Sequence, residues 1–542
     1  MPNTNMTLDP STQNRSAKKS SKTAILMMSS CLILGIPACS TLPKQQQIIP
    51  QYAYDIDTEN TTLSQIVSPL KQQYPDLTGY HVLYEPLEAI AARIQLIDKA
   101  EKTLDLQYYI WDNDKVGALA LYKIIQAADR GVKVRLLMDD NNAKAMEGIY
   151  LALDQHPNIE VKLFNPYKFR KFRPIDMVLD LKRINRRMHN KTFTADNQIT
   201  LIGGRNMSNQ YYNVSDNYQF SDVDVMLVGQ AVDDISHSFD EYWNHPYAYQ
   251  VRNIVSHGYT LRYPGLKEQL TKHYEEVTVQ NYLDLSNKTH DFDQWLNRDI
   301  QLDWVKAEII KDSPEKVKSK AKKEEHLNFQ LVQRLKVPEK SVDIISAYFV
   351  PQDIGEAHLS RLAQNGVDVR VLTNSFKAND VALVHAFYAK YRKNLLKNGV
   401  QLYEFLPALP EEYQNINNPE ISKKSRVSLK GLSRSSLHAK LMALDDKQVF
   451  IGSFNFDPRS ANLNTEIGVI LNSKPLANAV HKTMDANLKY YAYKLVLDSK
   501  GKINWQLTTP NGIRTLTKEP KMNFLKRAGI KVISWLPIEG FM

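Results

Sequence analysis

Cysteine is nearly absent from this chain, which has two in 542 residues, Cys31 and Cys39. Cys31 lies inside a charge-free stretch near the N-terminus, and Cys39 directly follows that stretch. We expect processing at this point to leave a mature protein with neither a thiol nor a disulfide. Burial of an apolar core must then hold the fold, which a chain of this length can achieve.

Long apolar runs are also scarce. The charge-free stretch, 23–38, is too short and too rich in small residues to span a membrane comfortably. Three lysines precede it, which is typical of a secretory signal. It ends Ile36-Pro37-Ala38-Cys39, which resembles a bacterial lipobox, whose cysteine is acylated. We expect a lipoprotein-type signal over 1–38 with Cys39 as the lipidation site; a plain signal peptide or short anchor helix is the alternative.

Acidic residues are too few to balance the basic ones. Lys and Arg number 69 against 59 Asp and Glu, for a net charge of +10. This excess indicates an anionic partner, such as phospholipid, nucleic acid or another phosphate ester. With 43% apolar and 24% charged residues the chain is of the globular class, and its length predicts more than one domain.

A strand-helix-strand series occurs twice. In the first copy, strands are expected at 103–110, 131–137 and 159–164 with a helix at 117–129; in the second, strands at 341–348, 366–372 and 399–405 with a helix at 354–364. Alternating strands and helices predict an α/β fold of two pseudo-symmetric domains, each a mainly parallel mixed β-sheet flanked by helices.

Composition suggests the boundaries between these parts. Residues 40–75 are polar, whereas 305–325 hold seven lysines and five acids and few large apolar side chains. We therefore expect a flexible tether at 39–80, a first domain at 81–300, a charged, solvated linker at 301–330, and a second domain at 331–542 with a C-terminal membrane-facing segment.

Each half carries the same motif with the same internal spacing. The first reads His189-Asn-Lys191-x4-Asp196 followed by Gly203-Gly-Arg-Asn206, and the second reads His438-Ala-Lys440-x4-Asp445 followed by Gly452-Ser-Phe-Asn455. All matched positions are 249 residues apart, and of thirteen histidines only these two have lysine two residues later. A spacing of two in a strand directs His and Lys into one cleft.

These residue types suit chemistry on a phosphodiester. Imidazole supplies a nucleophile or an acid near neutral pH, lysine a positive charge and asparagine a neutral hydrogen bond. Donors from both halves could surround one phosphate and stabilise its transition state. We therefore expect both histidines to share one site.

The paired motifs resemble those of the phospholipase D superfamily. The region from about residue 85 onward resembles the bacterial cardiolipin synthases, particularly their C-type branch. The matching stretches are Tyr108-Tyr-Ile-Trp111, Arg186-Arg-Met-His-Asn-Lys191, Gly203-Gly-Arg-Asn206 and Leu536-Pro-Ile-Glu539.

The resemblance implies a two-step reaction through a phosphohistidine, without metal or cofactor. It assigns His189 as the nucleophile and His438 as the acid and base, although the reverse assignment of the two histidines stays open. Lys191 and Lys440 bind phosphate. The aspartates of the motif, Asp196 and Asp445, complete the predicted catalytic set, although we expect them to brace the fold.

The predicted substrate-binding group adds four residues: Asn206, Asn455, Asp222 and Glu466. The two asparagines bind phosphate, and the two acids orient the histidines. Glu466 fits the second half and Asp222 the first, with Asp224 as a nearby alternative. Arg205 stands where many members have serine; it either faces substrate or pairs with a local acid.

Basic residues gather before each motif. Residues 168–188 hold eight basic and two acidic residues, and 423–436 hold five basic and none acidic. The first stretch is interleaved with a helix-like apolar stripe suited to a membrane interface: Ile175, Val178, Leu179, Leu181, Ile184 and Met188. The C-terminal stretch 524–535 is similar. Core packing is the alternative for both.

The sequence thus predicts a cardiolipin synthase-like phosphatidyltransferase that uses phosphatidylglycerol, with phosphatidylethanolamine as a further candidate, at a membrane surface, with no nucleic acid partner. The alternatives are a phospholipase D hydrolase, a nuclease, and an inactive lipid-anchored membrane-binding protein. We expect a periplasm-facing location in the bacterial envelope, with inner or outer membrane left open.

Overall fold

The structure is a computed structural model that describes residues 42–43, 48–214, 219–255, 258–289, 302–379, 381–407, 435–520, 522–523, 529–530, 533–535 and 538–541. The predicted signal and Cys39 lie outside these ranges, as do most of 423–436 and 524–535. Residues 45–542 belong to one compact unit. None of the described helices is long and apolar enough to cross a bilayer.

The first half begins with η1 (Ala53–Asp55), α2 (Thr62–Gln73), β1 (Thr78–Leu83), α3 (Pro86–Lys99), β2 (Thr103–Tyr108), α4 (Lys115–Asp129), β3 (Lys133–Asp139), η2 (Ala143–Met146), α5 (Glu147–Leu153) and β4 (Ile159–Phe164). It continues with η3 (Arg170–Phe172), α6 (Pro174–Leu179), α7 (Leu181–Ile184), β5 (Thr192–Ala195), β6 (Ile199–Gly203), η4 (Asn209–Tyr211), β7 (Gln219–Ser221), β8 (Asp224–Gly229), α8 (Gln230–Trp243), β9 (Ala248–Gln250), α9 (Val251–Ile254), α10 (Tyr263–Tyr274), α11 (Val277–Thr289) and β10 (Asp303–Val305).

The second half begins with β11 (Ala307–Lys311), η6 (Pro314–Lys318), η7 (Lys323–Glu325), α13 (Leu327–Arg334), β12 (Ser341–Ser346), α14 (Gln352–Gln364), β13 (Asp368–Asn374), α15 (Ala382–Lys397) and β14 (Gln401–Phe405). It continues with β15 (Ser435–Leu437), β16 (Lys440–Leu444), β17 (Gln448–Gly452), α18 (Pro458–Asn462), β18 (Ile467–Leu471), α19 (Lys474–Tyr491), β19 (Ala492–Leu497), β20 (Ile503–Thr509), β21 (Gly512–Leu516) and η9 (Glu539–Phe541).

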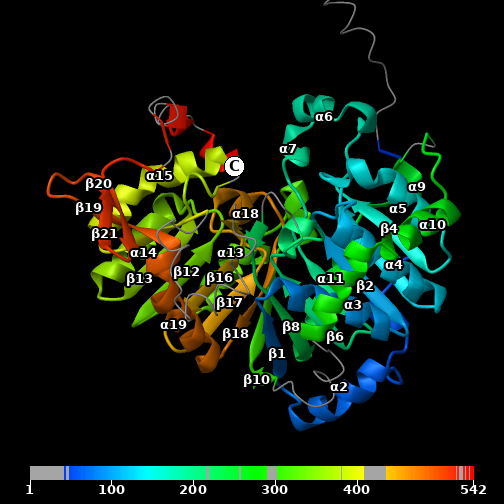
Figure 1. The fold of residues 1–542 in the computed structure, drawn as a ribbon. Coiled ribbons are helices and arrows are strands. Elements are labelled where there is room, and N and C mark those ends of the chain that lie inside the picture. The colour runs from blue at the N-terminus through cyan, green and yellow to red at the C-terminus, as the bar shows by residue number, and fades with distance from the viewer. Residues whose placement is uncertain are drawn as a thin grey trace, which may run out of the picture. The chain divides into compact units, whose positions relative to one another are not determined.

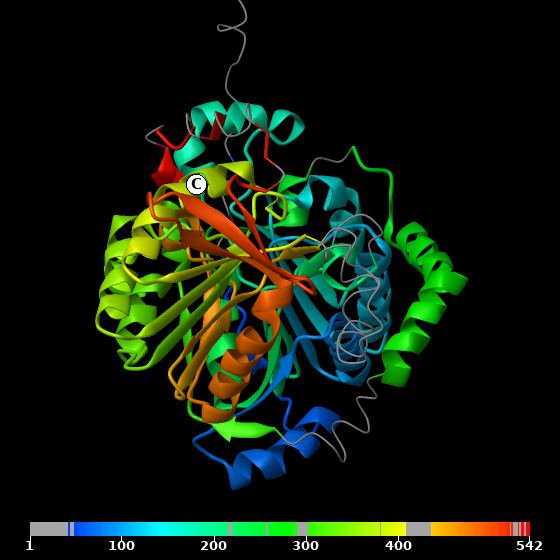
Figure 2. The same ribbon diagram turned by 60° about the vertical axis from the view of Figure 1, so that its left-hand side comes forward.

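Each half is built on one mixed sheet with helices packed against it (Figure 1). The first sheet has the order β10-β1-β8-β6-β5-β2-β3-β4-β9, and the second β11-β18-β17-β16-β12-β13-β14-β19-β20-β21. Figure 2 shows α19 lying across strands of the second sheet. The predicted α/β class and the strands and helices of both series are confirmed.

The prediction of a mainly parallel sheet holds only for one group of three strands in each sheet, which lies near the centre of the second sheet and toward one edge of the first. Strands β2, β3 and β4 are parallel, as are β12, β13 and β14, but the neighbouring strands pair antiparallel. The reason is the motif itself, because β5 and β6, and likewise β16 and β17, are consecutive strands joined by tight turns. Short connections of that kind permit only antiparallel pairing.

The predicted tether is wrong for most of its length. Leu63 and Val67 of α2 are buried, at the i, i+4 spacing of one helix face, and β1 pairs with both β8 and β10. Polar residues around them obscured this short apolar face in the sequence. The folded body therefore includes residues that we had assigned to a flexible segment.

The predicted solvated linker is wrong in character. Strand β10 pairs with β1 in the first sheet, and β11 pairs with β18 in the second, so the chain changes sheets at residue 306. Lys316 is buried, with its Nζ 2.8 Å from Oδ1 of Asp312. A lysine can be buried when it is paired in this way, which charge counting alone cannot reveal.

An apolar cluster joins the two halves. Side chains of β8 and β6, including Val225 and Ile202, pack with those of β16, β17 and β18, including Leu441, Ile451 and Val469. These strands meet near the middle of the view in Figure 1. The two sheets thus face each other through a shared core, which fixes the loops at their edges relative to one another.

Candidate active site

The two His-x-Lys segments lie where the halves meet. The backbone N–H of His189 donates to the carbonyl of Thr465 at 2.9 Å, and that of His438 donates to the carbonyl of Ser221 at 2.8 Å. Strand β15, which leads into His438, pairs in parallel with β7 from the first half. Each catalytic segment is therefore bonded to the backbone of the other half, in a reciprocal arrangement.

Each histidine is oriented by a carboxylate of the opposite half. Nδ1 of His189 lies 2.8 Å from Oε2 of Glu466, and Nδ1 of His438 lies 2.6 Å from Oδ2 of Asp222. Our prediction that each acid served the histidine of its own half was wrong. The exchange follows from the backbone pairing, because Glu466 directly follows Thr465 and Asp222 directly follows Ser221.

The carboxylates hold the Nδ1 atoms, so the Nε2 atoms are the ones that can face a substrate; Nε2 of His438 lies 3.3 Å from Nζ of Lys440. It was also wrong to group Asp222 and Glu466 with substrate-binding residues, since both are buried behind the rings. The alternative residue, Asp224, is engaged elsewhere, with Oδ2 2.8 Å from Nη2 of Arg93.

The loop after the first motif has Gly204 where the loop after the second has Ser453, and this difference matches that between the acids Asp222 and Glu466. Ser453 Oγ donates to Oε2 of Glu466 at 2.5 Å, and Ser460 Oγ donates to Oε1 at 2.9 Å. At the position equivalent to Ser453 stands Gly204, where a Cβ would lie 2.2 Å from Oδ1 of Asp222. The shorter aspartate must approach its loop more closely, and only glycine leaves the room.

Arg205 does not face the site. Its guanidinium is buried and donates to the carbonyls of Leu83 and Tyr84 at 2.8 Å and of Asp222 at 2.6 Å. It also lies 3.5 Å from Asp224. Of the two alternatives, pairing with local groups is the one that the structure supports.

The lysines and asparagines of the motif line the same region. Nζ of Lys191 donates to the carbonyl of His189 at 2.6 Å, and Lys440 makes the equivalent bond to the carbonyl of His438. Asn206 donates to the hydroxyl of Tyr211 at 2.8 Å. The side-chain oxygen of Asn455 is buried without a partner among the described residues. A phosphate oxygen is an acceptor, so the amide nitrogen of Asn455 is the group that would donate to it.

The two aspartates of the motif do not belong to the catalytic set. Asp196 accepts the backbone N–H groups of residues 101–103, and Asp445 accepts those of residues 339–341. Each thereby ties the turn after its motif strand to the start of β2 or β12. We were wrong to count them as catalytic, although their bracing role is as expected.

Comparison with known proteins assigns the chain to a family. The family described as "Cardiolipin synthase, PLD-like domain" matches residues 93–243 and 331–488. Cardiolipin synthase C of Escherichia coli (strain K12) is 40% identical over 480 residues, which cover 89% of this chain and 99% of that protein.

The chain belongs to the cardiolipin synthase family of PLD-like proteins.

Other similarities agree with this assignment. The major cardiolipin synthase of Bacillus subtilis (strain 168) is 25% identical over 394 residues, covering 72% of this chain and 65% of its own. A crystal structure of phosphatidylserine synthase from Haemophilus influenzae Rd KW20 superposes with a TM-score of 0.52 at 14% identity, covering 88% of this chain and all of that one. The latter likeness concerns the fold.

Burial and positive charge lower the pKa of both histidines of this cardiolipin synthase family member. Burial, then the charges of Lys191 and Lys440, holds the pKa of His189 well below its usual value. Burial and Lys440 also lower the pKa of His438, but Asp222 opposes them. A neutral imidazole at pH 7 is the form that can attack phosphorus.

The same crowding acts on a lysine. Burial, together with the charge of Lys440 and against that of Glu466, lowers the pKa of Lys191 to about 7. The crossed contacts of His189 with Glu466 and of His438 with Asp222 bring the two halves of the site together. The charge of Lys440 can therefore act on Lys191, and that of His438 on His189. Among the described residues, no group of three His, Cys, Asp or Glu side chains could hold a metal ion.

Sequence reasoning missed the aromatic rings around the histidines. Tyr109 packs edge-on against His189 with ring centroids 5.0 Å apart. Tyr211 and Phe220 pack against His438 at 5.2 and 4.9 Å. Tyr109 lies in one of the stretches that carried the family resemblance, which was the available signal; Tyr211 and Phe220 had none. The rings fix the imidazoles and exclude water from one side.

Proposed function

We propose that the protein is a phosphatidyltransferase that moves a phosphatidyl group between glycerophospholipids, with phosphatidylglycerol as donor and acceptor and phosphatidylethanolamine as a further substrate. The observation that carries this proposal is the pair of buried histidines, each held through Nδ1 by a carboxylate of the other half. Family membership and the four cationic and amide side chains beside them support it.

In the first step Nε2 of His189 forms a bond to phosphorus. The bond from phosphorus to the oxygen of the donor's head-group glycerol breaks, so the phosphatidyl group stays on the histidine. That oxygen takes a proton from His438 as it leaves. In the second step the acceptor's hydroxyl gives its proton to His438 and attacks phosphorus, which releases His189. The lysines stabilise the equatorial oxygens throughout.

The environments of the two histidines support this division of roles. Although burial raises it, the pKa of Asp222 is lowered overall by His438 and Lys440, so this carboxylate stays ionised and stabilises a His438 imidazolium. Burial raises the pKa of Glu466, and burial with the charges of Lys191 and Lys440 lowers the pKa of His189, so this imidazole is neutral and can attack. An anionic phosphate between the lysines favours protonation of His438 further.

The test is a product analysis with purified enzyme in phosphatidylglycerol vesicles, with and without phosphatidylethanolamine. We expect cardiolipin and glycerol, lost in His189→Ala and His438→Ala. Phosphatidic acid as the sole product would replace the transferase with a phospholipase D hydrolase, which uses water as acceptor. Trapping of a phosphohistidine in wild-type but not in His189→Ala would identify the nucleophile.

We further propose that the segment 168–184 contacts the lipid surface. The predicted apolar stripe divides in two: Ile184 and Met188 are buried, whereas Val178 and Leu179 are 82% and 67% exposed. Phe172, 62% exposed, adds to the exposed group. Large exposed apolar side chains beside lysines suit the boundary of an anionic bilayer.

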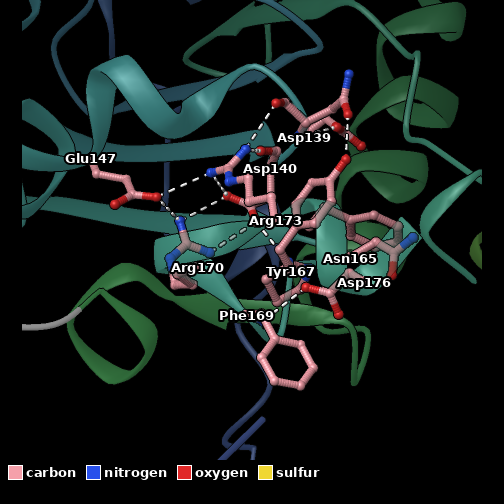
Figure 3. Close-up of polar contacts among 12 residues, drawn as sticks. Asp139, Asp140, Glu147, Asn165, Tyr167, Phe169, Arg170, Arg173 and Asp176 are labelled. Atoms are coloured by element: carbon pink, nitrogen blue, oxygen red, sulfur yellow. Dashed lines mark hydrogen bonds and ion pairs between the residues drawn. The ribbon is translucent and has the colours of Figure 1, made fainter. Parts of the chain in front are cut away.

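A network of buried charges holds this segment in place (Figure 3). Arg170 donates to both oxygens of Asp140 at 2.8 and 2.9 Å and to Glu147 at 2.6 Å. Arg173 donates to Glu147 at 3.0 Å, and Asp176 accepts the N–H of Phe169 at 2.8 Å. Five of the basic residues counted toward a lipid-facing charge are therefore paired with acids of the protein itself: Lys168, Arg170, Arg173, Arg183 and Arg187.

This contact can be tested by sedimentation with phosphatidylglycerol vesicles in a Cys39→Ala background, which removes any acyl anchor. We expect Val178→Asp with Leu179→Asp to weaken binding about tenfold or more, since each carboxylate must be brought to the lipid. Ile513→Asp, at a 66% exposed site on β21, is the matched control. Equal binding by both variants would contradict the proposal.

We also propose that Cys39 carries a lipid anchor in the bacterial envelope, facing the periplasm, on the basis of the lipobox-like sequence. Mass spectrometry of the mature N-terminal peptide tests this. An unmodified cysteine, or cleavage elsewhere, would overturn it.

A further inference from the structure

The second half contains an apolar cavity of about 320 Å³. It lies between helices α13 and α14 and one face of the sheet formed by β12 and β16. Its walls include Leu331, Ile344, Phe349, Leu359, Met442 and Phe456. Two more lining residues, Val332 and Val337, are 72% and 77% exposed, so the apolar lining continues to the protein surface.

The cavity begins beside the catalytic lysine of the second half. Along β16, Lys440 and Met442 lie on the same face, because alternate residues of a strand do, and a step of two residues is roughly 7 Å. Their partners on β12 repeat the pattern, with Ser346 opposite Lys440 and Ile344 opposite Met442. The floor of the site therefore continues directly into the cavity floor.

The loop that carries the catalytic asparagine closes the same end. Phe454 and Phe456 line the cavity and flank Asn455 in the sequence, and Asp457 lines it as well. The loop 454–457 thus lies between the predicted phosphate-binding site and the apolar cavity.

The equivalent space in the first half is filled. The halves correspond closely here, because Trp111 bridges Met207 as Phe349 bridges Phe456. By the same correspondence, Ser346 of the second half occupies the position of Tyr108, and Phe349 occupies the position of Trp111. Both residues of the second half are smaller. Trp111 and Tyr108 are both buried.

Charged groups complete the filling of the first half. Arg93 of α3 donates to Asp224 at 2.8 Å and to the Tyr108 hydroxyl at 3.2 Å, and Arg205 lies beside them. The second half has Phe454 in place of Arg205. It has Gly468 in place of Asp224, because Asp224 pairs with the first glycine of the first motif loop and Gly468 pairs with the first glycine of the second. Its helix α13 has 8 residues, whereas α3 has 14. The space beside the motif strands is thus packed with large and charged side chains in the first half, whereas in the second half it is an apolar cavity.

We propose that this cavity binds one acyl chain of the glycerophospholipid whose phosphate lies between His189 and His438. The proposal rests on the proposed function and adds the place of a lipid tail. The cavity lies at the small end of the range for ligand pockets, and its lining is predominantly apolar as such pockets are. At about 30 Å³ for a water-sized group, it holds roughly ten methylenes.

Such a cavity makes the rate depend on chain length. With phosphatidylglycerols presented as monomers, we expect kcat/KM of the wild-type enzyme to rise with acyl length up to about ten carbons and then level off. Leu359→Trp fills the cavity from α14 and should end the rise at a shorter chain, with the shortest substrates unaffected. Ile513→Trp on β21 is the control and should follow wild-type.

An identical dependence on chain length in Leu359→Trp and wild-type would overturn the proposal. A second measurement reads the cavity without turnover. Phosphatidylglycerol with a diazirine at the end of one chain should label peptides of α13 and α14 in wild-type, and less so in Leu359→Trp. Labelling confined to other segments would also overturn it.

The chain-length kinetics and the diazirine labelling together distinguish a failure of the proposed function from a failure of the acyl-site proposal. Absence of any phosphodiester turnover in wild-type, with α13 and α14 labelled, would contradict the proposed function but not the acyl site. Turnover with neither labelling of these helices nor a chain-length effect would contradict the acyl site alone.

Discussion

At the scale of single residues, the decisive feature is the exchange of carboxylates between the halves. Glu466 reaches His189 from the second half, and Asp222 reaches His438 from the first. The motif spacing drew attention to the two histidines, and the family resemblance drew attention to the two acids. Neither could assign the pairs, because sequence distance says nothing about which of two equivalent partners lies closer in space.

Glu466→Gln should lower kcat by a factor on the order of 10²–10⁴, since the amide can no longer fix the imidazole tautomer as a carboxylate does. Steady-state kinetics in vesicles measures this. Because Glu466 acts through His189, the variant combined with His189→Ala should be no slower than His189→Ala alone. Glu404→Gln, an equally buried carboxylate that accepts from Arg392 and Trp505, is the control for structural damage.

The pH profile should show the perturbed lysine. With a pKa of about 7, Lys191 is charged below this pH and loses its charge above it. We expect kcat/KM, which reports the free enzyme, to fall as the pH rises through about 7. In Lys191→Arg this alkaline limb should move upward even if the maximal rate is lower, because guanidinium stays charged. An unmoved limb would assign the titration to another group.

At the scale of elements, the motif strands are braced rather than activated by their aspartates. Asp196 has φ 48° at the turn between β5 and β6 and binds three backbone N–H groups at the start of β2. A left-handed residue with local hydrogen bonds is the usual solution for such a tight turn. The motif therefore mixes residues of two kinds, which sequence spacing cannot separate.

Asp196→Ala should lower the free energy of unfolding by about 2–4 kcal/mol, because buried N–H groups lose their acceptor. Urea denaturation measures this. The folded fraction should retain a kcat within about twofold of wild-type, unlike the histidine variants. A large loss of kcat with unchanged stability would return Asp196 to the catalytic set.

At the scale of the whole molecule, one chain supplies a complete site. The halves share an apolar cluster between their sheets, and backbone bonds cross at both histidines. Duplication with a shared interface gives two equivalent half-sites, while the filled and hollow spaces beneath them give the halves different tasks.

Mixing full-length His189→Ala and His438→Ala proteins should not restore transfer. Each variant lacks a histidine that only its own chain can place in its site. We expect the mixture to show the sum of the two residual activities, each reduced on the order of 10³-fold or more. Recovered activity would indicate exchange of halves between chains; an equimolar mixture of wild-type and His189→Ala is the control.

The sequence alone determined the α/β repeats, the paired motif and the family, because these depend on local periodicity and on residue types at fixed spacing. It did not determine the antiparallel strands beside each parallel group, the folded part of the supposed tether, or the burial of Lys316 in the supposed linker. These depend on which segments meet in space.

The tertiary structure alone decided which carboxylate serves which histidine, and which half is hollow. Both outcomes follow from packing two similar halves face to face. Reciprocal backbone pairing brings Glu466 and Asp222 across the interface, and smaller side chains beneath the second motif leave a cavity there. Equivalent sequence positions thus acquire different neighbours, and with them different chemistry.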